Sequence, residues 1–138
     1  MDLETTAMYA DRQAALDEAG RAAVTAALTV PPSDVSHTLL VLDGDVVVGH
    51  AALRPFGESL EVKKVFVDAA HRGKGSARRL MNELEVVARK ANARSLVLQT
   101  GHAQVPAMAL YESLGYTKIE AFGAYAAIPF GVCYEKTL

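Results

Sequence analysis

The hydrophobic positions in the middle of the chain fall into short runs that have the length of β-strands. Residues 39–42 and 46–53 are rich in leucine and valine, and only Asp43-Gly44-Asp45 separates them. Gly44 tolerates the positive φ of a tight turn, so this pattern predicts a β-hairpin. A third run, residues 60–67, contains β-branched residues and Phe66. It predicts another strand, with a loop over residues 54–59 before it.

Apolar residues recur at helical spacing in three other segments. Residues 9–28 are rich in alanine and predict a helix, interrupted near Gly20, that ends before the prolines of residues 30–34. After Gly75 the apolar positions are Leu80, Met81, Leu84, Val87, Ala88 and Ala91. A third helix is expected to begin at Pro106 and to stop at Gly115, with Ala107, Leu110, Tyr111 and Leu114 on one face.

The order of these elements indicates the fold class. Residues 95–100 form a short apolar strand candidate, and residues 116–121 and 132–136 are two more. The predicted order is helix, hairpin, strand, turn, helix, strand, helix and two strands. This order predicts an α+β fold with a mixed sheet. A length of 138 residues without an internal repeat predicts a single domain over residues 1–138.

Composition narrows the class of protein. The net charge of −2 and the pI near 6.1 argue against nucleic acid as a partner. Cys133 is the one cysteine, so no internal disulfide can form, and a reducing compartment fits. The first ten residues lack the features of a signal peptide, and no apolar run reaches membrane-spanning length. We therefore expect a cytoplasmic protein without a membrane partner.

The stretch "HRGKGSARRLM", from His71 to Met81, places two glycines and two cations directly before a predicted helix. A helix N-terminus favours anions, and glycines let a phosphate approach the backbone closely. The P-loop pattern fails because Asp68 occupies its first glycine position and Gly75 follows Lys74. The dinucleotide-binding pattern G-x-G-x-x-G also fails, because its third glycine position is Arg78.

A third phosphate-binding pattern, [QR]-x-x-G-x-[GA], is met by Arg72, Gly75 and Ala77. Alone it is weakly specific, and a glycine-capped surface turn would satisfy it as well. Its neighbours strengthen it: "LEVKKVFV" precedes the turn, and "LVLQTG" and "AMALYESLGY" follow in order. Together these segments resemble the GNAT superfamily of acetyl-CoA-dependent N-acetyltransferases over about residues 38–138. The resemblance implies a GNAT-like, mostly antiparallel mixed sheet, splayed at its centre and flanked by helices.

The resemblance also implies a binding mode for acetyl-CoA. The N–H groups of Gly73, Lys74, Gly75, Ser76 and Ala77 would hold the pyrophosphate, with support from Arg72. Backbone groups of Val65, Phe66 and Val67 would meet the pantetheine arm, and Ala107 would allow its close approach.

Two residues are candidates for the proton transfers that accompany acetyl transfer from acetyl-CoA to an amine. By resemblance, Tyr111 would protonate the leaving sulfur, although a tyrosine on an apolar helical face also suits a core position. Glu61 would act as the base, directly or through water, but an ion pair with Lys63 or Lys64 is nearly as good an explanation. The remaining rival bases are water, His50 and His102. The residues that we expect to be structural are His37 and His71, in loops, and Cys133, in the core. No metal-ligand spacing is present.

The acceptor is expected to be the amine of a small molecule such as an amino acid. Arg54 would clamp an acceptor carboxylate or, alternatively, remain a solvated charge over the loop that contains Phe56. A non-catalytic acyl-CoA-binding or sensing module is the alternative class. A homodimer is compatible with the resemblance.

Overall fold

The computed structural model describes residues 18–138, so the predicted helical residues 9–17 lie outside the described part. The first described helix, α3 (Glu18–Leu28), continues through Gly20 without a break. The expected interruption therefore does not occur within Glu18–Leu28. A glycine costs a helix only about 1 kcal/mol relative to alanine, and the alanines around it favour the helix. Leu28 ends α3 before the prolines, as predicted, and Pro32–Asp34 form one 3₁₀ turn.

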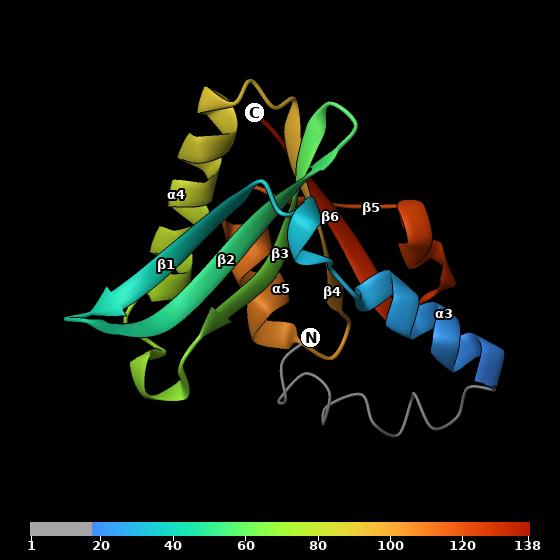
Figure 1. Cartoon of the computed structure of the whole chain (residues 1–138), viewed down its shortest axis with the longest axis horizontal. Helices are drawn as coiled ribbons and strands as arrows, with labels where there is room; N and C mark the ends of the chain where they lie inside the picture. The colour runs from blue at the N-terminus through green and yellow to red at the C-terminus, as the bar shows by residue number, and fades with distance from the viewer. Residues whose placement is uncertain (1–17) are drawn as a thin grey trace. The chain divides into compact units, whose positions relative to one another are not determined.

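Within residues 18–138, six strands form one sheet with the order β1-β2-β3-β4-β6-β5 (Figure 1). The strands are β1 (His37–Asp43), β2 (Val46–Phe56), β3 (Ser59–Val67), β4 (Ser95–Gly101), β5 (Thr117–Ile119) and β6 (Gly131–Thr137). The α-helices that follow α3 in the described part of the chain are α4 (Ser76–Lys90) and α5 (Val105–Ser113). This arrangement confirms the predicted α+β fold with a mixed, mostly antiparallel sheet.

The β1–β2 hairpin forms where the sequence predicted it, and Gly44 adopts a φ of 60° in its turn. The loop expected over residues 54–59 is wrong. Strand β2 runs on to Phe56, β3 begins at Ser59, and only Gly57 and Glu58 connect them. Gly57 supplies the positive φ, 56°, that allows this tight turn. The consequence is a second hairpin, in which Arg54 lies directly opposite Glu61.

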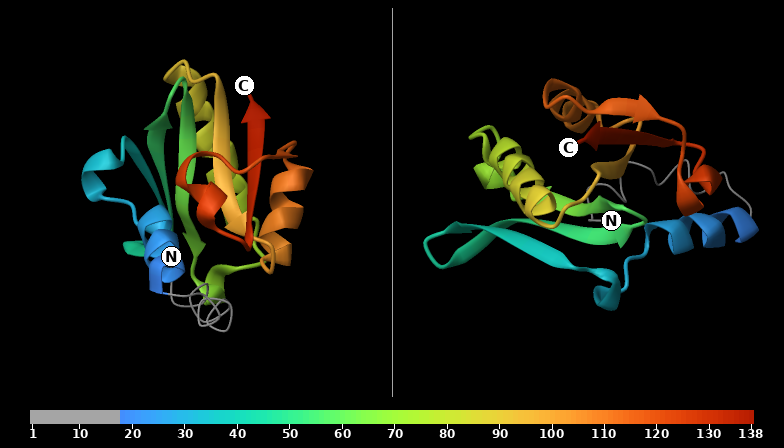
Figure 2. Two further views of the ribbon diagram at one scale, coloured as in Figure 1. Left: turned by 90° about the vertical axis from the view of Figure 1, so that its right-hand side faces the viewer. Right: turned by 90° about the horizontal axis from the view of Figure 1, so that it is seen from above.

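The chain divides into two compact units, and each is described by itself. The larger unit contains residues 31–98 and 135–138. In it α4 lies along one face of strands β1, β2 and β3, as the two views of Figure 2 show. Its buried side chains toward the sheet are Leu80, Met81, Leu84 and Ala88, while Val87 is half-buried and Ala91 exposed. The predicted helical face is thus correct at its centre and ends before Ala91.

Strand β3 pairs with β4 in parallel over a short length. The paired residues are Leu60 with Leu96 and Glu61 with Val97. Residues of β3 after Glu61 lie beyond this register, although β3 continues to Val67. The two central strands therefore pair at one end, in agreement with the splay implied by the family resemblance.

The smaller described unit contains residues 18–30 and 99–134. Helix α5 begins with a proline in its first turn and is followed by Gly115 at a φ of 93°, as predicted. The core of this unit includes Tyr125, Ile128, Phe130 and Cys133, so Cys133 is a core residue as expected. Residues 116–121 contain only the three-residue strand β5, which is shorter than predicted. The structure places a 3₁₀ helix at Gly123–Ala127, an element that the sequence pattern did not indicate.

Candidate functional site

The glycine turn connects β3 to α4 and has the backbone geometry of an anion-binding loop. Gly73 and Gly75 adopt φ values of 77° and 79°, in the left-handed region. A Cβ atom at either position would meet nothing within 4 Å, so open space lies beside both. Gly75 is the N-cap of α4, and Arg79 N–H donates to its carbonyl (3.0 Å). The N–H groups of Ser76 and Ala77 therefore precede the helical ladder and can receive an anion.

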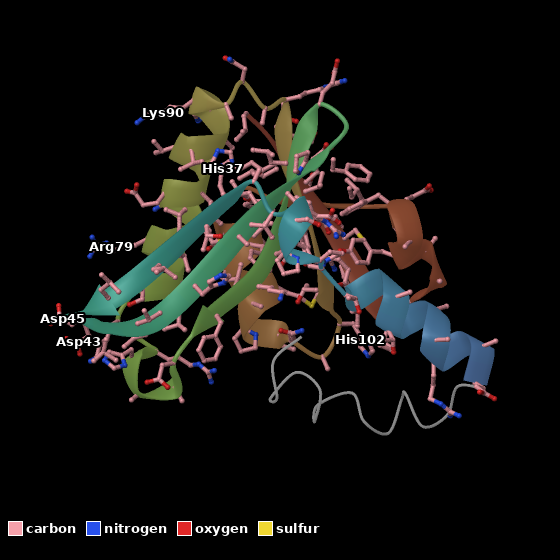
Figure 3. All side chains as sticks on the ribbon, viewed as in Figure 1. His37, Asp43, Asp45, Arg79, Lys90 and His102 are labelled. Carbon is pink, nitrogen blue, oxygen red and sulfur yellow. The ribbon has the colours of Figure 1, made fainter. Side chains whose placement is uncertain are left out.

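The cations of the loop add positive potential to this helix end. Arg72 and Lys74 are both exposed, and Ser76 and Ala77 are half-buried. The Nε atom of Arg72 donates a hydrogen bond to the carbonyl of Val67 at 3.0 Å, which ties the loop to the end of β3. The structure thus brings the predicted residues 72–77 together around one helix N-terminus. Arg79 of the same helix points outward in Figure 3.

Strand β3 contains a β-bulge just before its end. His50 pairs with Phe66 and Ala52 with Lys63, so Lys64 and Val65 together face Ala51. Lys64 has a φ of 53°, which is unusual for a residue other than glycine. Bulges redirect the backbone and occur next to active sites more often than elsewhere in sheets. Of the predicted pantetheine-binding residues, Val65 belongs to this bulge, and Phe66 and Val67 follow it directly.

His50 holds the bulge from the neighbouring strand. Its Nδ1 atom lies 3.0 Å from the carbonyl oxygen of Lys64. A carbonyl oxygen only accepts, so Nδ1 carries the proton, and in the neutral ring Nε2 is an acceptor. The sequence had singled out His50 only as a rival base. Its contact with the bulge was missed, because no local pattern marks an irregularity that depends on the pairing of two strands.

Glu61 belongs to a buried ion cluster. Its side chain is 1% exposed; Arg54 Nε lies 2.7 Å from Oε1 and Lys63 Nζ lies 3.7 Å from Oε2. Burial lowers the pKa of Lys63, and the carboxylate of Glu61 offsets part of this effect. The ion pair with Lys63 was one of the sequence hypotheses, whereas neither hypothesis for Arg54 included a bond to Glu61. Glu61 consequently has a structural role in addition to any catalytic one.

Tyr111 and Ala107 lie on α5 in the smaller unit. Tyr111 is 8% exposed, and its ring packs against those of Tyr116 and Tyr134, with centroid distances of 5.9 and 6.0 Å. Burial raises the pKa of Tyr111 to about 12. Its phenol is therefore protonated throughout the neutral range and available as a donor. Ala107 is half-buried and precedes Tyr111 by about one helical turn.

The other histidines have structural partners. His102 Nδ1 lies 3.0 Å from the carbonyl of Phe130, to which the His102 N–H also donates. His37, expected in a loop, begins β1 and contacts Ser36 Oγ at 2.9 Å. His71, also expected in a loop, ends a 3₁₀ turn and contacts two aspartates. Within residues 18–138 no three His, Cys, Asp or Glu side chains gather as a metal site would require.

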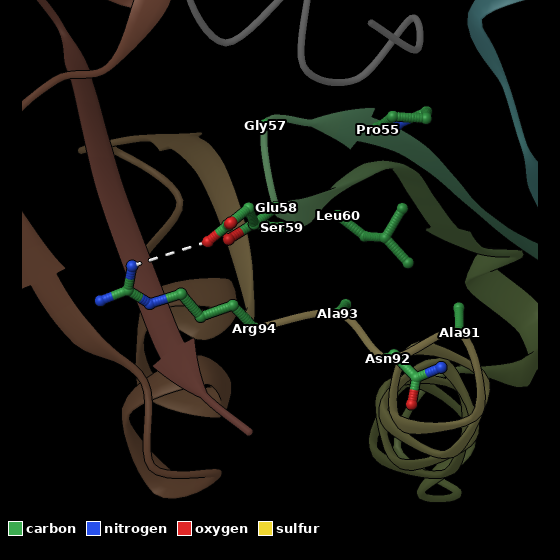
Figure 4. Close-up of a pocket in the computed structure, with 9 residues that line it drawn as sticks. All are labelled: Pro55, Gly57, Glu58, Ser59, Leu60, Ala91, Asn92, Ala93 and Arg94. Carbon is green, nitrogen blue, oxygen red and sulfur yellow. Dashed lines mark ion pairs between the residues drawn. The ribbon is translucent and has the colours of Figure 1, made fainter.

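A surface cavity of about 570 Å³ lies in the larger unit, between the β2–β3 turn and the turn from α4 to β4 (Figure 4). Its charged walls are Glu58 and Arg94, whose side chains are 3.9 Å apart and both largely exposed. The cavity lies at the C-terminal end of α4, whereas the glycine turn lies at the N-terminal end. A helix of this length separates the two by about 20 Å, so the cavity is no part of the candidate coenzyme site.

The fold and the glycine turn define an acyl-CoA-dependent transferase, and comparison with known proteins agrees. Residues 3–116 match the acetyltransferase (GNAT) family. An IAA acetyltransferase of Azospirillum brasilense is 34% identical over 80% of this chain and 72% of its own. A crystal structure from Klebsiella pneumoniae, described as an acyl-CoA N-acyltransferase, is 33% identical, with a TM-score of 0.72 over 88% of this chain and 92% of its own.

A Bacillus subtilis acetyltransferase solved in complex with CoA shares the fold, with a TM-score of 0.67 at 17% identity over 78% of this chain and 79% of its own. The chain belongs to the GNAT family of N-acetyltransferases. It is accordingly an enzyme that uses acetyl-CoA as cosubstrate and a small molecule as acceptor. Among the described residues no helix is long and apolar enough to span a membrane.

Proposed function

We propose that residues 1–138 act as one catalytic domain that transfers the acetyl group of acetyl-CoA to the amine of a small acceptor such as an amino acid. The amine attacks the thioester directly while both substrates are bound. The observation that carries the proposal is the glycine turn. Gly73 and Gly75 both adopt left-handed φ values beside open space, at the N-terminus of a 15-residue helix. This is a geometry that only glycine adopts easily and that suits a pyrophosphate.

In this proposal the coenzyme lies along β3 and ends on the turn. The N–H groups of residues 73–77 hold the pyrophosphate, and Arg72 supports them. The pantetheine arm lies along Val65, Phe66 and Val67, and Ala107 allows its close approach. Support comes from the short pairing of β3 with β4, which stops at Glu61 and leaves residues 65–67 beyond that register. A strand N–H near Val67 would stabilise the charge that develops on the thioester oxygen.

Tyr111 is the proposed general acid. Its buried phenol keeps its proton at neutral pH, because burial raises its pKa to about 12. It would donate toward the leaving sulfur as the C–S bond breaks and the amide bond forms. Glu61 is the proposed base, acting directly or through water. Its ion pairs with Arg54 and Lys63 make a water-mediated route the more natural of the two, and water alone or His50 remain alternatives.

We propose that the acceptor approaches near Arg54 and Glu61. A homodimer and a cytoplasmic location are further proposals, the latter supported by the single buried cysteine. Sedimentation measurements would settle the oligomeric state.

Two measurements on the full chain test the proposed function. Calorimetric titration with acetyl-CoA should show binding, and a screen over amines, read as release of free thiol, should show turnover with at least one small acceptor. Binding without thiol release for any amine would favour a non-catalytic acyl-CoA sensor. Absence of binding by a folded protein would refute the coenzyme assignment.

A further inference from the structure

His71 directly precedes the glycine turn and lies between two carboxylates. Its Nε2 atom is 2.9 Å from Asp43 Oδ2, and its Nδ1 atom is 3.1 Å from Asp68 Oδ2. Carboxylate oxygens accept hydrogen bonds and, when ionised, do not donate them. Both ring nitrogens must therefore carry a proton for both bonds to form. The arrangement selects the imidazolium form of His71.

The two aspartates come from different parts of the larger unit. Asp68 follows β3 and begins the 3₁₀ turn Ala69–His71. Asp43 ends β1 at the tip of the β1–β2 hairpin, where Figure 3 labels it beside Asp45. His71 thus connects the hairpin tip to the segment from which the glycine turn emerges. The contact to Asp43 joins residues that are 28 positions apart in the sequence.

The segment before the turn has further hydrogen bonds, one of which reaches β2 of the hairpin. Asp68 N–H donates to the carbonyl of Val48 (2.7 Å), and His71 N–H donates to that of Asp68 (2.9 Å). Arg72 is bonded to the end of β3 through the carbonyl of Val67. The His71–Asp43 bond adds a side-chain attachment at the hairpin tip, where β1 ends, and Gly73 follows after a single residue. Loss of the His71–Asp43 bond would therefore act directly on the backbone of the glycine turn.

We propose that His71, as an imidazolium between Asp43 and Asp68, is a positioning residue that fixes the start of the coenzyme loop against the β1–β2 hairpin and makes coenzyme affinity dependent on its own protonation. This rests on the proposed coenzyme role of residues 72–77. His71 itself touches no coenzyme atom in the proposal. It limits the conformations that the turn adopts before binding. Less conformational entropy is then lost when the N–H groups of the turn are ordered around the pyrophosphate.

The charges around His71 set the direction of the pH effect. Hydrogen bonds to Asp43 and then to Asp68 raise its pKa above the ordinary value, and the nearby charge of Lys74 opposes part of this. We call the two hydrogen bonds of His71, to Asp43 and to Asp68, the clamp. A raised pKa of His71 in the folded state means that the clamp is complete at about pH 6 and is lost as the pH rises through the folded-state pKa. The three side chains are partly exposed, so the effect should be several-fold, not orders of magnitude.

The test compares coenzyme A affinity of the wild type and His71→Gln by calorimetry from about pH 6 to about pH 9. The ratio of the two dissociation constants cancels the titration of the coenzyme itself. We expect His71→Gln to bind about fivefold more weakly at the lower pH and to approach the wild type at the higher one. His37→Gln is the matched control, a histidine on β1 outside the clamp, and its ratio should stay near one. A ratio for His71→Gln that is flat with pH overturns the proposal.

A second variant and a spectroscopic signal test the same proposal if His71→Gln does not fold. Asp43→Asn changes a side chain that is 70% exposed at the hairpin tip and should keep the fold. It should weaken binding at the lower pH to an extent similar to His71→Gln, and the double variant should add little. In the wild type, ¹⁵N shifts should show both nitrogens of His71 still protonated above pH about 6.5, the ordinary pKa of histidine. Loss of either proton at or below that pH would contradict the clamp.

One further arm separates this proposal from the assignment of the loop. Gly75→Asp should weaken coenzyme A binding at every pH. If it does, and the His71→Gln ratio is flat, only the clamp fails. If Gly75→Asp binds coenzyme A as well as the wild type does, the loop assignment fails and the clamp with it.

Discussion

The imidazole of His50 donates from Nδ1 to the backbone carbonyl of Lys64, across a 3.0 Å contact between β2 and β3. The bond stabilises a bulge residue that has a φ of 53°. It also orients the peptide groups that lead into Val65, Phe66 and Val67. A side chain of β2 thereby controls the shape of the strand on which the coenzyme is proposed to lie.

Removing this bond should affect turnover more than coenzyme affinity. His50→Ala leaves the Lys64 carbonyl without its donor, and the free energy of unfolding should fall by about 0.5–1.5 kcal/mol. The bulge then has more freedom, so kcat should decline by about tenfold, while coenzyme affinity, which depends chiefly on the turn, stays within a few-fold. Thermal unfolding, calorimetry and steady-state kinetics check the three quantities. Unchanged kcat in the folded variant would show that the bulge does not need His50.

Gly75 should be essential for coenzyme binding. Gly75→Asp adds a side chain and a negative charge where a pyrophosphate must approach, so affinity should fall by at least about tenfold, or roughly 1.4 kcal/mol. Gly57→Asp is the matched control, because Gly57 has a φ of 56° and open space around it but lies in the β2–β3 turn. Equal losses of affinity in the two variants would point to backbone strain as the cause, and no loss in Gly75→Asp would exclude the turn.

Glu61→Gln should lower stability and turnover for separate reasons. The variant leaves Arg54 and Lys63 together without their carboxylate, and removing one partner of a buried ion pair costs about 3 kcal/mol. Turnover per folded molecule should fall chiefly at low pH, where the amine needs help to lose its proton. The pH–rate profile decides the matter: the same profile in variant and wild type would remove Glu61 from catalysis and leave the ion cluster as its role.

Tyr111→Phe should reduce turnover while it preserves the fold. The ring contacts with Tyr116 and Tyr134 remain, so thermal stability and coenzyme affinity should stay near those of the wild type. Loss of a general acid is worth about 10²–10⁴-fold, and we expect the lower end because a thiolate leaves readily. Tyr116→Phe, from the same aromatic group, is the control and should keep its turnover. If Tyr111→Phe loses stability but not turnover per folded molecule, Tyr111 is a packing residue.

The sequence alone was sufficient for the parts of the protein that depend on a few adjacent residues. Gly44 between two valine- and leucine-rich runs predicted the first hairpin, and Gly75 before an amphipathic run predicted a glycine turn and the start of α4. Glycine, proline and apolar spacing act on the backbone within one or two turns, so these features can be read without knowing what packs nearby. No interruption occurs between Glu18 and Leu28, because a single glycine is a weak signal against several helix-forming neighbours.

Tertiary structure decided the features that depend on the pairing of distant segments. Glu61 meets Arg54 because the turn at Gly57 and Glu58 is shorter than the pattern suggested, and a different register would have placed another side chain opposite. The bulge at Lys64 exists only with respect to β2. His71 meets Asp43 across 28 residues because the hairpin tip and the 3₁₀ turn after β3 lie together. Such contacts are set by strand register and by packing, which no local pattern of side chains records.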